Sequence, residues 1–205
     1  MGVVIVILQL VSVIAGSILL AASILNLFND EIVFWPPPFE GSWQHRTFLL
    51  LFRVMFYSLV ALSSVLIWLQ GLTVSISIFC VGLFLMVFGF GIALLATGLL
   101  GWRQAFGVKE GLRTEGLFSI SRNPVYVATW FGMVGWSQLV PEPAVWLVLA
   151  QWALIYLIAI FLEERWLRTQ FGAEFERYTK ITRRIVGWRS PRVDGRINTE
   201  SHLRR

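Results

Sequence analysis

The sequence has few charged residues and almost no cysteine. Charged side chains make up 14% of the 205 residues and hydrophobic ones 57%, whereas roughly a quarter of the residues in a soluble domain are charged. This balance, with a mean hydropathy of +0.71, excludes an ordinary soluble domain and indicates an integral membrane protein. The single cysteine, Cys80, lies in a hydrophobic run, which rules out an internal disulfide, a cysteine-rich zinc site or a redox pair. We expect Cys80 to be a small buried side chain, and we expect no metal site.

Long apolar runs dominate the chain instead. Most of them exceed the roughly 18 residues that mark a membrane-spanning helix. The N-terminal residues lack the basic region of a signal peptide, so we expect the first run to be a retained helix. The predicted fold is all-α: a polytopic bundle of about five transmembrane helices, followed by a C-terminal amphipathic helix at the membrane interface. The predicted spans are Val3 to Leu27, Phe48 to Leu69, Leu72 to Leu100, Val125 to Val140 and Ala144 to Leu162.

All the lysines and arginines fall on one side of this predicted bundle. Of the 17, two lie in or just after the connection between the first two spans, four lie between residues 101 and 124, and eleven follow Leu162. The positive-inside rule therefore predicts that the hinge (residues 101–124) and the C-terminus are cytoplasmic, with the N-terminus on the opposite side. The net charge of +5 then reflects topology and attraction to anionic lipid, so we expect no nucleic-acid partner.

Polar residues gather in two places. One is the hinge and the two residues after it, at residues 103–126 (RQAFGVKEGLRTEGLFSISRNPVY), and the other is the C-terminal segment, residues 163–188. Asn is a good N-cap and Pro suits the first helical position, so Asn123 and Pro124 predict the start of a helix whatever the function. The same helix start would direct free N–H groups and a positive dipole end towards water, where they can hold the carboxylate of a polar cofactor. Tyr126 adds an aromatic ring and a hydroxyl group nearby.

Two adjacent glutamates, Glu163 and Glu164, follow the last apolar run. Neighbouring residues on a helix point about 100° apart, so these two carboxylates cannot share one target. Glu164 has Arg168 four residues later, which predicts a solvated or salt-bridged side chain. Glu163 faces apolar positions without a local partner, and we expect it to be the ligand-binding carboxylate. Apolar residues at helical spacing between 171 and 181 predict the amphipathic helix, which can close over the hinge.

The connection between the first two spans, NDEIVFWPPPFEGSWQHR, is rich in aromatic residues and proline. Aromatic rings prefer the headgroup layer of a membrane, so an interfacial belt is one interpretation. The other is a lid or portal beside a lipid-facing site. In that case Trp35 and Trp43 would contact substrate, and His45 could accept a proton near neutral pH.

The hinge and the C-terminal segment together resemble the isoprenylcysteine carboxyl methyltransferase and phospholipid methyltransferase superfamily. The resemblance lies in GLRTEGLFSISRNPVY, an intervening helical hairpin, and EERWLRTQFGAEFERY. The family pattern is an R-(H/N)-P-x-Y stretch, a hairpin, a Glu-Glu pair and an FGxx(Y/F)xxY segment. The resemblance divides the chain into residues 1–100, with the first three transmembrane helices, a cofactor-binding half at 101–188, and a basic tail at 189–205.

This resemblance implies an integral membrane methyltransferase that uses S-adenosylmethionine and methylates a lipid or another lipophilic acceptor. Asn123, Pro124, Tyr126 and Glu163 belong to the motifs themselves, and the earlier positions depend on an ungapped alignment. Ala159 stands where the isoprenylcysteine enzymes place an Arg associated with substrate, which argues against a prenylated-cysteine carboxylate as the acceptor. The cofactor-binding residues implied by the resemblance are Arg103, Glu110, Gly111, Leu112, Arg113, Phe118, Asn123, Pro124, Val125, Tyr126 and Glu163.

Two other classes of protein remain open. One is a sterol-type NADPH reductase of similar helical layout, although its fuller Asn-Tyr and Arg-Asp-Glu patterns are not found in the sequence. The other is a non-catalytic membrane scaffold or small transporter, for which Arg53 and Gln151 are too few polar groups to form an ion path. No catalytic residue is assigned, and His45, Glu110 and Tyr126 are candidate bases. Ethanolamine phospholipid, prenylated thioether acid, thiol, quinone-like lipid and sterol all remain open as acceptors, as does the oligomeric state.

Overall fold

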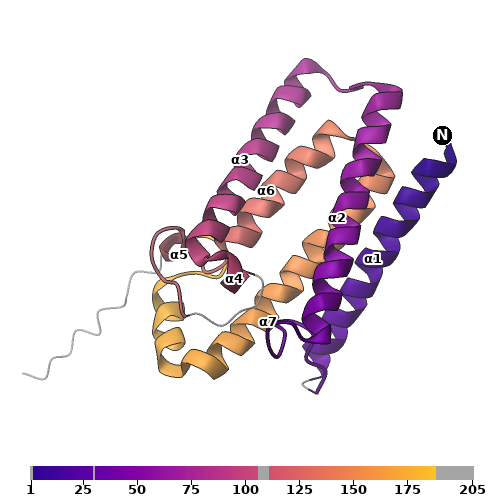
Figure 1. Ribbon diagram of the computed structural model, residues 1–205. Coiled ribbons are helices and arrows are strands. Elements are labelled where there is room, and N and C mark those ends of the chain that lie inside the picture. Colours follow the sequence, from indigo (N-terminus) through magenta and orange to yellow (C-terminus); the bar gives the residue numbers. More distant parts are fainter. Residues whose placement is uncertain (1, 30, 106–110, 188–205) are drawn as a thin grey trace, which may run out of the picture.

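The computed structural model describes residues 2–29, 31–105 and 111–187, and Figure 1 shows their arrangement. These residues form seven helices and no β-strand. The predicted all-α membrane bundle is therefore confirmed. The helices are α1 (Gly2–Phe28), α2 (Trp43–Gln70), α3 (Ile76–Leu100), α4 (Trp102–Ala105), α5 (Leu117–Ile120), α6 (Pro124–Leu139) and α7 (Pro143–Ile181).

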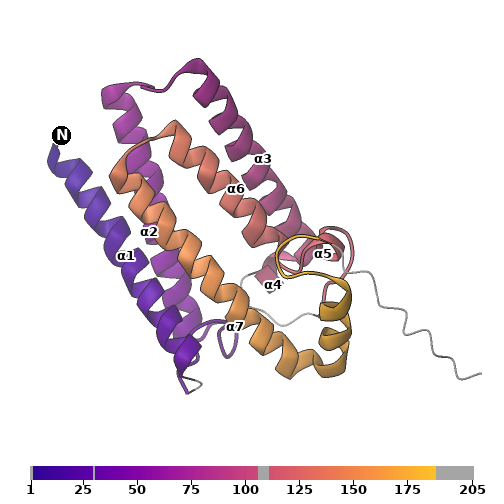
Figure 2. The ribbon, with the colours of Figure 1, turned by 180° about the vertical axis from the view of Figure 1, so that it is seen from behind.

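Four of the described helices, α1, α2, α3 and α7, are long and apolar enough to cross a membrane. Helix α6, the fourth span predicted from the sequence, has 16 residues. At 1.5 Å per residue it is about 24 Å long, which is shorter than the roughly 30 Å of a hydrocarbon core. It lies alongside α3, as two opposite views show (Figures 1 and 2).

Helix α7 continues well past the predicted end of the fifth span, as far as Ile181. It bends at Gly172, whose φ of 45° and ψ of −118° suit a residue without a Cβ. Beyond this kink the last turns fold back towards α5 (Figure 1). They correspond to the predicted amphipathic helix, and their apolar face, with Phe175 and Tyr178, is buried.

Helices α3 and α6 pack very closely because glycines face each other. A Cβ on Gly89 would lie 2.2 Å from the backbone nitrogen of Gly132, and a Cβ on Gly135 would lie 2.3 Å from that of Met86. The two backbones can therefore approach this closely only because Gly89 and Gly135 have no side chain.

The other face of α3 is exposed, and it carries Phe84, Phe88 and Cys80. The prediction that Cys80 is buried was therefore wrong. In a membrane helix an apolar residue can face lipid, so hydrophobicity does not predict contact with protein.

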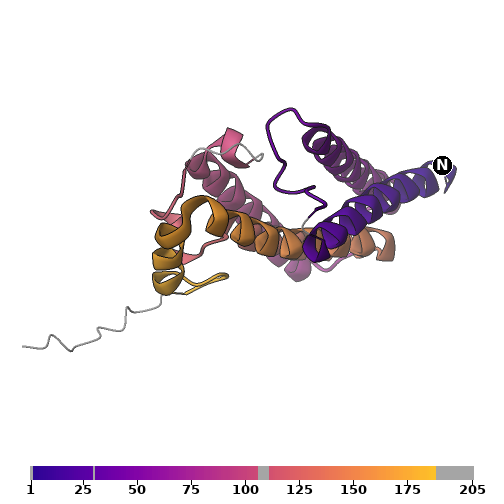
Figure 3. The ribbon, with the colours of Figure 1, turned by 90° about the horizontal axis from the view of Figure 1, so that it is seen from below.

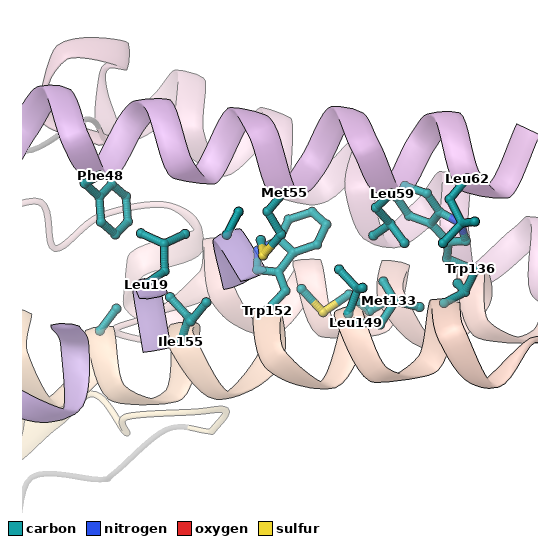
Figure 4. Close-up of a cluster of buried hydrophobic side chains, with 14 of the residues drawn as sticks. Leu19, Phe48, Met55, Leu59, Leu62, Met133, Trp136, Leu149, Trp152 and Ile155 are labelled. Carbon is teal, nitrogen blue, oxygen red and sulfur yellow. The ribbon is translucent and has the colours of Figure 1, made fainter. Parts of the chain in front are cut away.

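Helices α1, α2 and α7 pack together as a second group, and α7 also contacts α6. Figure 4 shows Met55 and Leu59 of α2 directed towards Leu149 and Trp152 of α7. The polar Gln151 in this apolar region donates a hydrogen bond from Nε2 to Oγ of Ser17 in α1, at 2.9 Å. Its polar group therefore joins two helices rather than lining an ion path.

Candidate functional site

The hinge and the end of the C-terminal segment lie against each other. The backbone N–H of Arg122 donates to the carbonyl of Arg183 at 3.0 Å. The hydroxyl of Tyr178 donates to the carbonyl of Phe118 at 2.5 Å. The kink in α7 thus folds the C-terminal segment onto the hinge, as the sequence predicted.

Asn123 and Pro124 begin α6, also as predicted. The side chain of Asn123, however, makes no capping hydrogen bond. Its Nδ2 donates instead to the carbonyl of Arg184 at 3.0 Å, and Asn123 is buried. The backbone at this position starts the helix, and the side chain attaches the C-terminal segment to it.

Glu164 is the centre of a buried ion-pair cluster. Its carboxylate lies 2.9 Å from Nη2 of Arg122 and 2.8 Å from Nη2 of Arg184, and the residue is 3% exposed. These hydrogen bonds to Glu164 raise the pKa of Arg184 above its ordinary value, so the guanidinium stays charged. The prediction that Glu164 is solvated or salt-bridged is confirmed in its second alternative, but the partner is not Arg168, which pairs with Glu176 on the surface at 2.8 Å. The i,i+4 rule considers only partners on the same helix, and here the stronger partners come from other segments.

Glu163 faces a different environment. Nε1 of Trp35 donates to its Oε1 at 2.9 Å, and the hydroxyl of Tyr126 donates to the same oxygen atom. Among the described residues, nothing donates to Oε2. Both donors are neutral, so the negative charge of an ionised Glu163 has no protein cation beside it in this part of the structure.

A cavity of about 320 Å³ lies between the hinge, α7 and the connection that precedes α2. We call it the hinge cavity. Its wall includes most of the cofactor-binding residues that the superfamily resemblance implies. Those that line it are Leu112, Arg113, Phe118, Asn123, Pro124, Val125, Tyr126 and Glu163.

Two of the three remaining implied residues lie outside the cavity wall. Arg103 is exposed and pairs with Glu40 at 3.0 Å, and it does not line the hinge cavity. Gly111 is also absent from the wall, and its carbonyl accepts a hydrogen bond from Gln104. Glu110 lies outside the described residues, as does the basic tail at 189–205.

Of the three residues suggested as substrate contacts, one lines the hinge cavity and two do not. Trp35 is buried and lines the hinge cavity. Trp43 is 68% exposed, as an interfacial belt residue would be. His45 is buried at the start of α2, where its Nδ1 accepts a hydrogen bond from the backbone of Gly41 at 3.0 Å. Neither Trp43 nor His45 belongs to the cavity wall.

Sequence reasoning missed other parts of the wall. Tyr156 lines the cavity seven residues before Glu163, two turns away on the same helix face, and this spacing could have identified it. Ala159, which was compared above with a substrate-associated Arg, lies one turn before Glu163 and also lines the cavity. Phe48 and Phe52 of α2 also line the cavity, but no local pattern in the sequence connects α2 with the hinge.

A second cavity, of about 530 Å³, lies among α2, α3, α6 and α7. Its wall is almost entirely apolar, with residues such as Phe56, Ile67 and Leu94. Thr97, Val125 and Tyr156 belong to the walls of both cavities. We call this second space the apolar cavity, and it adjoins the hinge cavity at these shared residues.

The sequence model of the family described as Phospholipid methyltransferase matches residues 58–174, which is more than half of the chain. The chain belongs to the phospholipid methyltransferase family. It is thus a membrane methyltransferase by family, within the superfamily that its motifs resemble. Searches among curated proteins and among solved structures found no match.

Part of the wall of the hinge cavity lies within the region that matches the phospholipid methyltransferase family. The matched region contains Asn123, Tyr126 and Glu163 of the cavity wall. It excludes α1, the connection after it and the first turns of α2. Trp35 therefore reaches the cavity from outside the matched region.

Proposed function

We propose that this member of the phospholipid methyltransferase family binds S-adenosylmethionine in the hinge cavity and transfers its methyl group to a lipophilic acceptor. The observation that carries the proposal is the arrangement of Glu163. Its Oε1 is held by Trp35 and Tyr126, and its Oε2 has no donor among the described residues. A carboxylate held in this way can accept strong hydrogen bonds from a charged amino group.

The charges of the cavity suit the proposed cofactor. S-adenosylmethionine carries a sulfonium and an ammonium group, and an ionised Glu163 with only neutral partners supplies the opposite charge. The cofactor also carries a carboxylate. The start of α6, at Pro124 and Val125, lines the same cavity, and the positive end of a helix dipole favours an anion. Arg113 adds a cation to this wall.

The size of the hinge cavity is also suitable. At about 320 Å³ it falls in the range of small-molecule sites, about 300 to 1,000 Å³. Phe118, Tyr126 and Tyr156 provide aromatic surface in the wall, against which a flat base can pack.

The chemistry needs mainly positioning. When bound, S-adenosylmethionine supplies an electrophilic methyl group for an in-line displacement. The protein then has to hold the acceptor against that group, and fixed geometry of this kind contributes much of the rate in comparable reactions. Tyr126 is fixed by its hydrogen bond to Glu163, so the wall around the reacting groups is already ordered.

The apolar cavity offers a place for the hydrophobic part of the acceptor. Its wall consists mainly of residues of the long apolar helices α2, α3 and α7 and of α6, and it meets the hinge cavity at Thr97, Val125 and Tyr156. A lipid tail in the apolar cavity would bring the polar end of the same molecule to the hinge cavity. In this proposal the hinge faces the cytoplasm, so the water-soluble cofactor enters from the cytoplasmic side and the acceptor enters from the bilayer.

The test is calorimetric titration of detergent-purified protein with S-adenosylhomocysteine, the product form of the cofactor, with NADPH as a control ligand. We expect micromolar binding of S-adenosylhomocysteine and none of NADPH. Binding of NADPH alone would place the chain functionally with the reductases. Folded protein that binds neither ligand would contradict the proposal and favour a scaffold.

A further inference from the structure

The connection between α1 and α2 contributes a side chain to the hinge cavity. Figure 3 shows this connection folding back towards α7. Trp35 lies in it, 6% exposed, and its indole nitrogen is 2.9 Å from Oε1 of Glu163. The family match begins at residue 58, so Trp35 lies outside the matched region and its contact with Glu163 comes from the structure of this chain alone.

Trp35 is itself held firmly in place. Its backbone N–H and that of Phe34 donate to Oδ1 of Asn26, at 2.8 and 3.0 Å. Asn26 is buried near the end of α1, and its carbonyl accepts a hydrogen bond from Arg165 of α7 at 2.9 Å. The indole ring stacks on Phe48 of α2, with ring centroids 4.2 Å apart. Three long helices therefore fix the direction in which this N–H points.

The orientation of a glutamate carboxylate is not fixed by its own side chain. The terminal torsion of glutamate has broad, roughly two-fold preferences, so Glu163 needs outside contacts to present one particular oxygen. Tyr126 donates to Oε1 from α6, and Trp35 donates to the same atom from the connection after α1. Two donors from separate elements restrict the rotation of the carboxylate more than either can alone.

We infer that Trp35 is a positioning residue of the hinge cavity: its indole N–H holds Oε1 of Glu163 so that Oε2 is presented to the ligand. This inference rests on the proposed function and extends it, because it makes the N-terminal part of the chain a component of the cofactor site. Trp35 acts through Glu163 and has no role in the transfer itself.

The first test compares the affinity of S-adenosylhomocysteine for the wild-type protein, Trp35→Phe and Trp43→Phe by calorimetry. Phenylalanine keeps an aromatic ring against Phe48 and removes only the N–H donor. We expect Trp35→Phe to weaken binding about 10-fold, as for loss of one hydrogen bond to a charged group. Trp43→Phe is the matched control, since Trp43 lies outside the cavity, and it should bind within about twofold of wild type.

The outcomes separate the inference from the proposed function. Equal affinity of wild type and Trp35→Phe would overturn the inference and leave the proposed function standing. Absence of binding to the folded wild-type protein would overturn both. A loss in Trp43→Phe as large as that in Trp35→Phe would also overturn the inference, because any change in the connection would then have the same effect.

A spectroscopic measurement tests the contact without depending on the stability of the variant. The indole ¹⁵N–¹H signal that is missing in Trp35→Phe identifies Trp35 in the wild-type spectrum. Because a carboxylate is a stronger acceptor than an amide, we expect this signal to shift in Glu163→Gln and again when S-adenosylhomocysteine binds. A signal that responds to neither change would show that the indole N–H does not report on Glu163, and would overturn the inference.

Discussion

The neighbouring residues Glu163 and Glu164 face two different regions of the molecule. Glu164 points into the contact between the hinge and the C-terminal segment, where Arg122 and Arg184 neutralise it. Glu163 lines the hinge cavity, where only neutral groups donate to it and one oxygen has no donor among the described residues. Pairing with two cations gives Glu164 a structural role, whereas in the proposed function the carboxylate of Glu163 is the group that a cationic ligand would neutralise.

The largest predicted effect is on stability, in Glu164→Ala. The substitution leaves Arg122, with its side chain 8% exposed, as a buried cation without its carboxylate. We expect a loss of about 3–5 kcal/mol in the free energy of unfolding, measured by denaturant unfolding in detergent. A double variant, Arg122→Met with Glu164→Met, should recover much of the loss because no buried charge is left unpaired, and the remaining partner, Arg184, is 39% exposed and can be solvated. Wild-type stability in Glu164→Ala would contradict the structural role of this residue.

Glu163→Ala should weaken ligand binding more than it lowers stability, the reverse of what we expect for Glu164→Ala. We expect binding of S-adenosylhomocysteine to weaken by about 10- to 100-fold, the range for loss of a hydrogen bond to a charged group, with a smaller loss of stability than in Glu164→Ala. Glu163→Gln, which keeps the shape and an acceptor oxygen, should fall between wild type and Glu163→Ala. Calorimetry and unfolding of the same preparations measure both quantities. If Glu163→Ala loses as much unfolding free energy as Glu164→Ala and keeps wild-type affinity for S-adenosylhomocysteine, the two glutamates do not have the different roles described above.

Arg184→Ala should have a moderate effect. Its side chain is 39% exposed, and Glu164 keeps Arg122 as a partner, so we expect a loss of about 1 kcal/mol. Arg122→Ala should cost more, because Arg122 also donates to the carbonyls of Thr179 and Thr182. Unfolding of the two variants side by side checks the order. The reverse order would show that Arg184 is the main partner.

The smallest effect is expected for Glu176→Ala. Glu176 and Arg168 form an ion pair with both side chains 51% exposed, and pairs of this kind contribute less than about 1 kcal/mol. Neither stability nor binding of S-adenosylhomocysteine should change measurably. The variant is therefore a matched control for the two buried glutamates, and a large loss in it would show that the end of α7 tolerates no change.

Local patterns in the sequence predicted much of this arrangement. Hydropathy predicted the long helices, and Asn123 with Pro124 predicted the start of α6. The different directions of Glu163 and Glu164 followed from helix geometry alone. The partners of both glutamates did not, because Trp35, Arg122 and Arg184 come from segments that only the tertiary fold brings together.

Two further features depended on tertiary structure. The sequence placed the end of the fifth span at Leu162, but packing of Phe175 and Tyr178 against the hinge extends α7 through a kink at Gly172. The side chain of Asn123 was expected to cap α6, and it instead donates to the carbonyl of Arg184 while it also lines the hinge cavity. Both features depend on contacts between distant segments, which local sequence patterns do not predict.

Methyl transfer itself is the most direct test of the central claim. Wild-type protein, Glu163→Ala and Glu176→Ala, each reconstituted in vesicles of mixed membrane lipids, would be incubated with S-adenosylmethionine labelled in its methyl group, and the lipid extract would be counted. We predict label in the lipid extract with wild type and Glu176→Ala, suppressed by S-adenosylhomocysteine, and almost none with Glu163→Ala. Equal labelling by wild type and Glu163→Ala would contradict the role of the hinge cavity, and no labelling by folded wild-type protein across a full panel of lipid acceptors would contradict the proposed function.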